Sequence, residues 1–166
     1  MIEIRTAILA DVPCLYAIYE AMGRKDEGYF ERSLEEGRTI LMADFEGRTA
    51  GFGILNWRPK YALYRKLGFP EIQDLNVLPD MRQKGVATAL ILKCEALARE
   101  KKCESIGVSV GLTKKYGPAQ RLYTKMGYRP DGNGVTYDRA SVSHGQRLPA
   151  DDDFCLMLVK NLEGEG

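Results

Sequence analysis

The stretch LNVLPDMRQKGVATAL, residues 75–90, leads from an apolar strand through a proline break into a helix, and it decides the fold. The start of a helix leaves backbone N–H groups without intrahelical partners and carries partial positive charge. Gly85 and Ala87 are small, so a phosphate could approach these amides closely. Arg82 and Lys84 add charge that a pyrophosphate would use. The stretch predicts a phosphate-binding turn but leaves the phosphorylated ligand open.

Two glycine-rich nucleotide-binding templates do not fit this stretch. A P-loop requires Gly-Lys-Ser/Thr after an earlier glycine, and a dinucleotide-binding fold requires three glycines in the pattern G-x-G-x-x-G. The chain has neither pattern here. A kinase or other nucleotide-phosphate binder is therefore disfavoured.

Hydrophobic periodicity outside this stretch predicts further strands and helices. Residues 58–70 and 130–134 read as irregular, and 138–153 as a polar segment. In the helix after the turn, Val86, Leu90 and Leu92 are among the expected apolar positions. Strands in both halves with helices between them indicate one mixed α/β domain. The strands are expected at 2–6, 39–45, 49–57, 71–78, 105–110 and 154–159, and the helices after Asp11, over 26–36, from about 84 to 101 and over 118–126.

Composition narrows the class of protein. The 166 residues carry 24 basic and 23 acidic side chains, a net charge of +1 that offers no broad surface for nucleic acid or an anionic membrane. Four scattered cysteines without a CxxC pair, and a single histidine, predict no metal site. We find no secretory signal and no apolar run long enough to span a membrane, so we expect a cytoplasmic protein.

Two motifs in order resemble those of GNAT-type acetyltransferases. Arg82-x-x-Gly85-x-Ala87 is similar to the family's pyrophosphate-binding motif. Ala119-Gln120-Arg121-Leu122-Tyr123-Thr124-Lys125-Met126-Gly127-Tyr128 resembles its second signature. The resemblance implies an N-acetyltransferase domain over 1–160 with a C-terminal tail at 161–166. It further implies a mostly antiparallel sheet of about seven strands flanked by about four helices, with a splayed strand pair forming the acetyl-CoA cleft.

The resemblance also implies which residues bind acetyl-CoA, the expected co-substrate. The pantetheine arm would pair with strand backbone at Leu75, Asn76 and Val77, and the N–H of Val77 would hold the thioester carbonyl. Tyr116 is also a cofactor-binding candidate that could shape the exit of the arm, although the family often has an asparagine at this position and a specific hydrogen bond to the arm does not follow. The pyrophosphate amides and their neighbours fall on Arg82, Gln83, Lys84, Gly85, Val86, Ala87 and Thr88.

Two side chains are candidates for proton transfer. Tyr123 lies where the family places its general acid, and a phenol can protonate a thiolate of similar basicity. Packing against the apolar side of its helix is the alternative for Tyr123. Glu71 is the first candidate for the base, at the family's offset from Arg82, and a strict strand period puts it on one face with Gln73 and Val77. Asp74, on the opposite face, is the second candidate, and a water chain is the third.

The acceptor is less well defined. We expect transfer to a primary amine of a small molecule, with a protein or peptide N-acetyltransferase and a non-catalytic acyl-CoA-binding regulator as alternatives. Aromatic residues could wall the acceptor pocket or be ordinary core residues. His144 is expected to be exposed, the acidic run 151–153 to be solvated, and a homodimer is possible. The aromatic candidates are Tyr16, Tyr19, Tyr29, Phe30, Trp57, Tyr61 and Tyr64.

Overall fold

A computed structural model describes residues 1–163 of the chain. The predicted tail at 161–166 therefore lies partly outside the described residues. The chain forms two compact units that interleave in sequence: the first comprises Met1–Trp57 and Ile72–Leu97, and the second comprises Arg58–Glu71 and the residues from Ala98 on.

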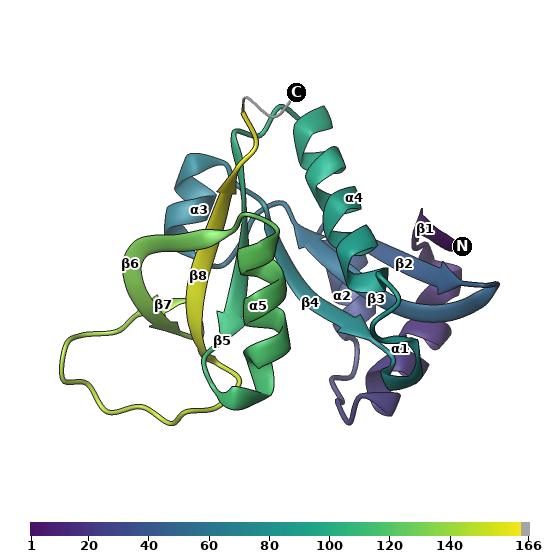
Figure 1. Ribbon diagram of the computed structural model, residues 1–166, viewed down its shortest axis with the longest axis horizontal. Helices are drawn as coiled ribbons and strands as arrows, with labels where there is room; N and C mark the ends of the chain where they lie inside the picture. Colours follow the sequence, from purple (N-terminus) through teal and green to yellow (C-terminus); the bar gives the residue numbers. More distant parts are fainter. Residues whose placement is uncertain (164–166) are drawn as a thin grey trace. The chain divides into compact units, whose positions relative to one another are not determined.

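The first unit contains four strands in the order β1-β2-β3-β4 (Figure 1). They are β1 (Ile2–Thr6), β2 (Thr39–Phe45), β3 (Arg48–Asn56) and β4 (Glu71–Val77). The pairs β1–β2 and β2–β3 are antiparallel. Its helices are the 3-10 turn η1 (Leu9–Asp11), α1 (Val12–Ala21), α2 (Tyr29–Glu35), the 3-10 turn η2 (Pro79–Met81) and α4 (Val86–Glu100), whose last turn enters the second unit.

The core of the first unit forms between α1, α2 and the strands. Leu15, Phe30 and Phe52 are fully buried there. Phe30 and Phe52 meet edge to face, with ring centroids 5.2 Å apart, a favoured aromatic geometry. This packing fixes helices α1 and α2 against β2 and β3, and so fixes the side chains that they direct toward β4.

The second unit contains four strands in the order β5-β8-β6-β7. They are β5 (Ser105–Gly111), β6 (Arg129–Tyr137), β7 (Ala140–Ser141) and β8 (Phe154–Asn161), all paired antiparallel. Its helices are α3 (Ala62–Leu67), the 3-10 turn η3 (Lys114–Tyr116) and α5 (Gly117–Lys125). Tyr61, Tyr64 and Met157 form the buried centre.

The predicted fold class is confirmed: the protein is mixed α/β with a mostly antiparallel sheet. Residues 1–163 contain eight strands and five α-helices, against about seven and about four expected. Within the same residues, no helix is both long and apolar enough to cross a bilayer.

Two segments expected to be irregular are regular. Helix α3 forms within 58–70, because Tyr64 packs against Tyr61 with ring centroids 4.7 Å apart and donates its hydroxyl to the Leu158 carbonyl at 2.9 Å. Such tertiary contacts stabilise a helix too short to form alone. Strand β6 includes 130–134, where a register shift between Pro130 and Val135 accommodates the glycines as a bulge.

Leu92, one of the apolar positions expected in α4, does not belong to the core. Leu92 is 52% exposed, whereas Val86, Leu90 and Cys94 are buried. The buried residues recur every fourth position along one side of the helix, and Leu92 falls outside that stripe.

Candidate functional site

Strand β4 is distorted at its centre. Asp74 has φ of 56°, a left-handed value that a residue other than glycine adopts rarely. The strict alternation of side chains predicted from Glu71 to Val77 therefore breaks at Asp74. The prediction that Glu71 and Asp74 lie on opposite faces assumed an unbroken strand, so it no longer follows. The neighbouring strand comes very close, since a Cβ atom on Gly51 would lie 2.3 Å from the carbonyl oxygen of Asn76. Only glycine allows this approach.

The segment between β4 and α4, which the sequence predicts to bind phosphate, contains two left-handed residues. The φ angle is −76° at Arg82, 61° at Gln83 and 85° at Gly85. Arg82 is extended, and the left-handed residues Gln83 and Gly85 turn the backbone sharply just before the helix, as in the concave turns that bind anions. The first hydrogen bond of α4 runs from the Ala89 N–H to the Gly85 carbonyl at 3.0 Å. The amides of Val86, Ala87 and Thr88, the first residues of the helix, consequently have no intrahelical acceptor.

The two basic residues of this turn have partners of their own. Arg82 donates Nε–H to the Val77 carbonyl at 3.2 Å, which ties the turn to the end of β4. Lys84 places its Nζ 5.4 Å from the centroid of the Phe45 ring. Both side chains remain exposed. The sequence shows their charge directly. It gave no indication that Arg82 also contacts the end of the strand on which the pantetheine arm is expected to lie.

The first candidate base, Glu71, is buried in the second unit. Only 1% of its side chain is exposed, and its Oε2 lies 2.8 Å from Nη2 of Arg139. The same Nη2 donates to the Ser109 hydroxyl at 2.8 Å. Burial lowers the pKa of the Arg139 guanidinium, but the charge of Glu71 and the hydrogen bond to it raise that pKa by more. Glu71 and Arg139 therefore form a buried ion pair within the second unit.

Arg139 reaches Glu71 from a tight turn between β6 and β7. Asp138 and Arg139 have φ of 48° and 66°, as a two-residue hairpin turn requires, although neither is glycine. Asp138 forms an ion pair with Lys60 at 2.7 Å. The sequence analysis assigned this turn to a polar segment and missed Arg139, because no local pattern pairs it with a glutamate 68 residues earlier.

Tyr123 is 6% exposed on α5. Its ring contacts Tyr128 edge to face at 6.0 Å, and its carbonyl accepts the Tyr128 N–H at 3.0 Å, which closes the end of the helix. Tyr123 thus packs in the core of the second unit, which agrees with the packing role given as the alternative in the sequence analysis. Its hydroxyl remains the candidate general acid.

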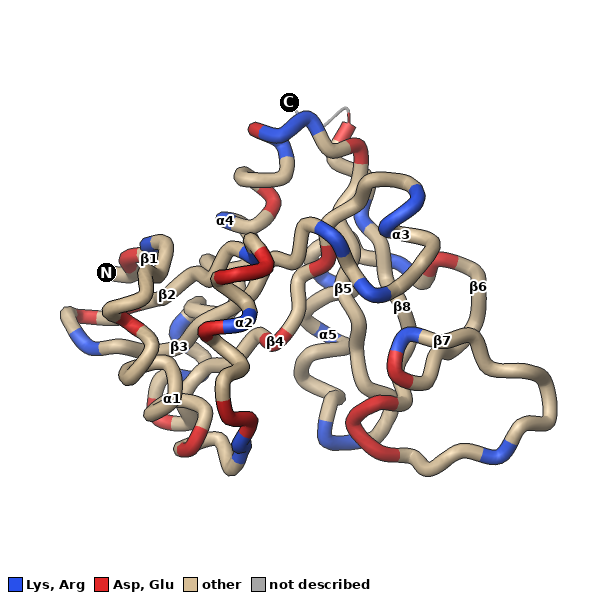
Figure 2. The backbone as a smooth tube through the Cα atoms, turned by 180° about the vertical axis from the view of Figure 1, so that it is seen from behind, with Lys and Arg blue, Asp and Glu red and all other residues tan. Residues whose placement is uncertain are grey.

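Tyr116 is engaged within its own unit. Its ring lies against the backbone of Gly111, where an added Cβ would come within 2.2 Å of the ring. Its hydroxyl donates to Asp152, which also pairs with Lys115 at 3.3 Å. Asp151 accepts the Tyr137 hydroxyl at 2.7 Å, a bond that raises the pKa of Tyr137 to about 12. The acidic run between β7 and β8 (Figure 2) is exposed, as the sequence predicted, and it also anchors a long loop through these contacts.

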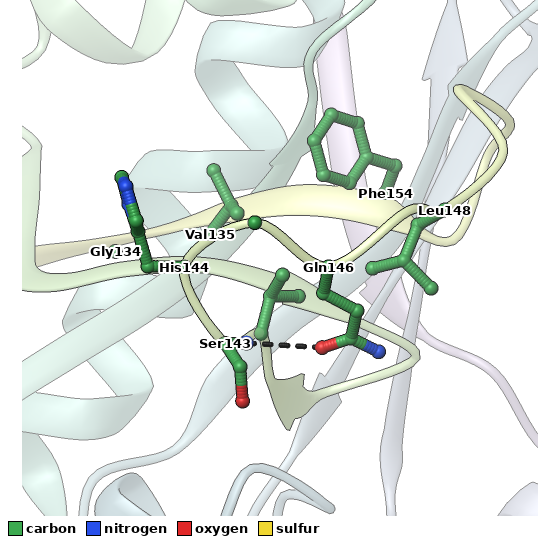
Figure 3. A pocket seen from close by; sticks show the side chains of 9 residues that line it. Gly134, Val135, Ser143, His144, Gln146, Leu148 and Phe154 are labelled. Atoms are coloured by element: carbon green, nitrogen blue, oxygen red, sulfur yellow. Dashed lines mark hydrogen bonds between the residues drawn. The ribbon is translucent and has the colours of Figure 1, made fainter.

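A shallow cavity of about 410 Å³ opens under this loop (Figure 3). Val135, Leu148 and Phe154 line it with apolar surface. Gln146 folds back to accept the Ser143 N–H at 2.9 Å. His144, at the rim, is exposed as predicted.

Asp74 is the centre of a second cluster, in the first unit. Its carboxylate accepts the Tyr19 hydroxyl at 3.1 Å, Nη1 of Arg24 at 2.6 Å and Nδ2 of Asn76 at 3.0 Å. Burial and the nearby Asp74 carboxylate raise the pKa of both Tyr19 and Tyr29. Tyr19 and Tyr29 were among the aromatic candidates for the acceptor region. Tyr19 is buried in the core like the candidates Phe30 and Tyr64, and Tyr29 is partly buried against it.

Comparison with known proteins shows which protein family this chain resembles. Residues 9–128, well over half of the chain and parts of both units, match the acetyltransferase (GNAT) family. The GCN5-related N-acetyltransferase 4, chloroplastic, of Arabidopsis thaliana is 32% identical over 101 residues, which are 58% of this chain and 32% of that protein. The chain thus spans about a third of the length of this curated relative.

Solved structures share the fold. The ribosomal-protein-S18-alanine N-acetyltransferase of Escherichia coli superposes with a TM-score of 0.74 at 15% identity, over 100% of this chain and 97% of that one. The yncA protein of Salmonella typhimurium, solved with its cofactor acetyl-CoA, gives 0.68 at 16% identity, over 99% and 95%. With the bulged strand, the anion-binding turn and the family match in agreement, the chain belongs to the acetyltransferase (GNAT) family, whose enzymes are acetyl-CoA-dependent acyltransferases.

Proposed function

We propose that this protein is an N-acetyltransferase that moves an acetyl group from acetyl-CoA to a primary amine of a small molecule, by direct attack in a ternary complex. The observation that carries the proposal is the turn from Arg82 to Thr88. Its left-handed residues, small side chains and unpaired helix amides fit a diphosphate, and it directly follows a bulged strand.

Each part of this segment has a task in the proposal. The amides of Gln83–Thr88 bind the pyrophosphate of acetyl-CoA, which supplies an activated acetyl group as a thioester. The backbone of Leu75–Val77 aligns the pantetheine arm, as an added strand would be aligned. The N–H of Val77 stabilises negative charge on the thioester oxygen during attack. Arg82 keeps the end of β4 in place through its bond to the Val77 carbonyl.

Two proton transfers complete the reaction. The amine nitrogen attacks the thioester carbon, the C–S bond breaks, and the hydroxyl of Tyr123 protonates the leaving sulfur. The proton that the amine loses passes to Glu71, to Asp74 or to a chain of waters. Glu71 is buried with its Oε2 2.8 Å from Nη2 of Arg139, so a proton that passes to this carboxylate must compete with that ion pair.

A panel of amines tests the proposal. Purified protein is incubated with acetyl-CoA and aliphatic amines, amino acids or short peptides, and thiol release is followed over time. Calorimetry with CoA measures cofactor binding separately. Transfer to a small amine supports the proposal, and transfer to peptides alone would favour a protein N-acetyltransferase. CoA binding with background thiol release for every amine and peptide would point to a non-catalytic regulator and defeat the proposal.

The cellular setting stays a prediction. We infer the cytoplasm from the sequence, although the curated relative is named as chloroplastic. A homodimer is likewise a prediction, which sedimentation of the purified protein tests directly.

A further inference from the structure

The guanidinium of Arg139 has donors that the rest of the protein does not use. Its Nη2 donates to Oε2 of Glu71 and to the Ser109 hydroxyl, each at 2.8 Å. Nη1 and Nε also carry N–H groups, but they form no hydrogen bond or ion pair with the described residues. Among those residues no side-chain nitrogen is buried without a partner, so Nη1 and Nε are open to solvent. Arg139 therefore presents unused donors at the edge of a buried ion pair.

These donors are held in a fixed orientation. The two bonds from Nη2 fix the guanidinium, and only 20% of the Arg139 side chain is exposed. The turn itself is also held, because Asp138 donates its N–H to the Asp153 carbonyl at 2.9 Å and pairs with Lys60 at 2.7 Å. The left-handed φ values of Asp138 and Arg139 are strained, and such strain persists only where the surroundings enforce it. An arginine fixed in this way loses little side-chain entropy when it binds a ligand.

The charges around Arg139 define the chemical class of that ligand. A guanidinium binds carboxylates through charge-assisted hydrogen bonds, so a carboxylate suits the unused donors. Glu71 already balances the charge of Arg139, and a second carboxylate alone would leave one negative charge in excess. A positive charge on the same ligand removes that excess. A molecule with both a carboxylate and an ammonium group, as in an amino acid, meets both conditions.

We propose that Arg139 binds the carboxylate of the acceptor, and that the acceptor is therefore an amino acid. This inference rests on the proposed function and narrows its substrate class. Glu71, the first candidate for the base, lies 2.8 Å from the same guanidinium, so a carboxylate on Arg139 brings the rest of the acceptor close to Glu71. Arg139 is then a residue that determines specificity, and the transfer itself takes place at the amine of the ligand.

Pairs of ligands that differ only in the carboxylate test this site without requiring turnover. Alanine, leucine, phenylalanine and lysine are compared with ethylamine, 3-methylbutylamine, 2-phenylethylamine and 1,5-diaminopentane by calorimetry on the full chain with CoA present. We expect the best-bound amino acid to bind about ten-fold more tightly than its amine, a factor that corresponds to about 1.4 kcal/mol. Amino acids that bind no more tightly than their amines overturn the proposal.

Variants of Arg139 locate the effect. Arg139→Lys keeps a cation for Glu71 but replaces the fork of donors with a single ammonium, so the preference for the amino acid should fall to about two-fold or less. Lys60→Met is the matched control, because it removes a surface charge that pairs with Asp138 in the same turn, and it should leave the preference unchanged. If Arg139→Lys does not fold, Arg139→Met combined with Glu71→Gln removes both charges of the pair and should lose the preference as well.

The outcomes separate this inference from the proposed function. A preference that persists in the Arg139 variants, or that Lys60→Met abolishes equally, overturns the carboxylate site whatever the enzyme does. Binding of an amino acid that depends on Arg139, without thiol release from any amine, supports the site and counts against the proposed function. Thiol release that is as fast with the simple amines as with the amino acids supports the function and counts against the site. A KM for the amino acid that Arg139→Lys raises and Lys60→Met leaves unchanged supports both.

Discussion

At the scale of single residues, the two candidate bases differ in their surroundings. Glu71 is buried with Arg139 in the second unit, whereas Asp74 is held by Tyr19, Arg24 and Asn76 in the first. Each acid has an arginine partner from a distant part of the sequence. A strand pattern identifies such acids as candidates, but it cannot reveal these partners, because they come from turns and connections that carry no periodic signal.

The buried pair of Glu71 and Arg139 should dominate a stability series. Arg139→Met leaves the Glu71 carboxylate buried without a cation, so we expect the free energy of unfolding to fall by about 3–5 kcal/mol in urea titrations. Adding Glu71→Gln should restore a part of this loss, because the unpaired charge disappears. Lys60→Met is the control: Lys60 and Asp138 are both more than half exposed, so its loss should cost about 1 kcal/mol or less. Equal losses for Arg139→Met and Lys60→Met would contradict this account of the pair.

Tyr123→Phe tests the proposed general acid. The ring keeps its contact with Tyr128, so the fold and CoA affinity should be preserved. Loss of the proton donor should lower kcat by about 100-fold, at the lower end of the range for acid catalysis. Steady-state thiol release gives kcat, and calorimetry gives the CoA affinity. Tyr128→Phe is the paired control, and a Tyr123→Phe enzyme as fast as the parent would assign Tyr123 to packing alone.

At the scale of elements, the proposed cofactor site is concentrated at the junction of β4 and α4. The close approach of Gly51 to Asn76, the bulge at Asp74 and the left-handed residues Gln83 and Gly85 all lie within this junction or against it. The sequence alone predicts an anion-binding turn here, because helix termini bind anions by a local mechanism. It placed the helix start near residue 84 instead of Val86, since Gly85 is the left-handed residue that precedes the first turn.

Gly85→Ala should separate stability from cofactor binding. Gly85 and Gly132 both have φ of 85°, so alanine at either position is strained by about 1–2 kcal/mol. Thermal unfolding should therefore shift down similarly in Gly85→Ala and Gly132→Ala. Only Gly85→Ala should also weaken CoA binding by about ten-fold or more, because it distorts the amides of the turn. Normal CoA affinity in Gly85→Ala would exclude this turn as the pyrophosphate site.

A second matched pair probes the strand itself. A methyl group at Gly51 meets the Asn76 backbone at 2.3 Å, whereas at Gly53 it meets the flexible end of the Leu75 side chain at 3.0 Å. Gly51→Ala must therefore displace β4, and we expect a loss of about 1–3 kcal/mol in stability and a higher KM for acetyl-CoA. Gly53→Ala should have the smaller effect on both. The reverse order would show that the backbone of β4 tolerates movement.

At the scale of the whole molecule, the protein consists of two interleaved compact units. The turn proposed to bind the pyrophosphate and the Asp74 cluster belong to the first unit, while Glu71, Tyr116 and Tyr123 belong to the second. The family match includes residues of both. Hydrophobic periodicity predicted most of the strands, but it gave no indication of this division, because a sheet is assembled from strands distant in sequence.

Thiol reactivity should report global opening of this structure. Burial raises the pKa of Cys94 to about 12, and Cys155 is also raised by burial. We expect alkylation at mildly alkaline pH to modify the partly exposed Cys14 and Cys103 first, and Cys94 and Cys155 only on the timescale of unfolding. Mass spectrometry of the digested protein gives the order. Early modification of Cys94 would indicate that the first unit opens locally.

The sequence by itself determined the fold class, through apolar periodicity, and the family, through the resemblance of two short motifs whose members lie within a few positions of each other. It also predicted a phosphate-binding turn from small residues at a helix start. Tertiary structure alone decided that α3 is a helix, that Arg139 pairs with Glu71, that Arg24 covers Asp74 and that Tyr116 binds Asp152. Each of these depends on contacts between residues far apart along the chain, whose free energy no local pattern contains.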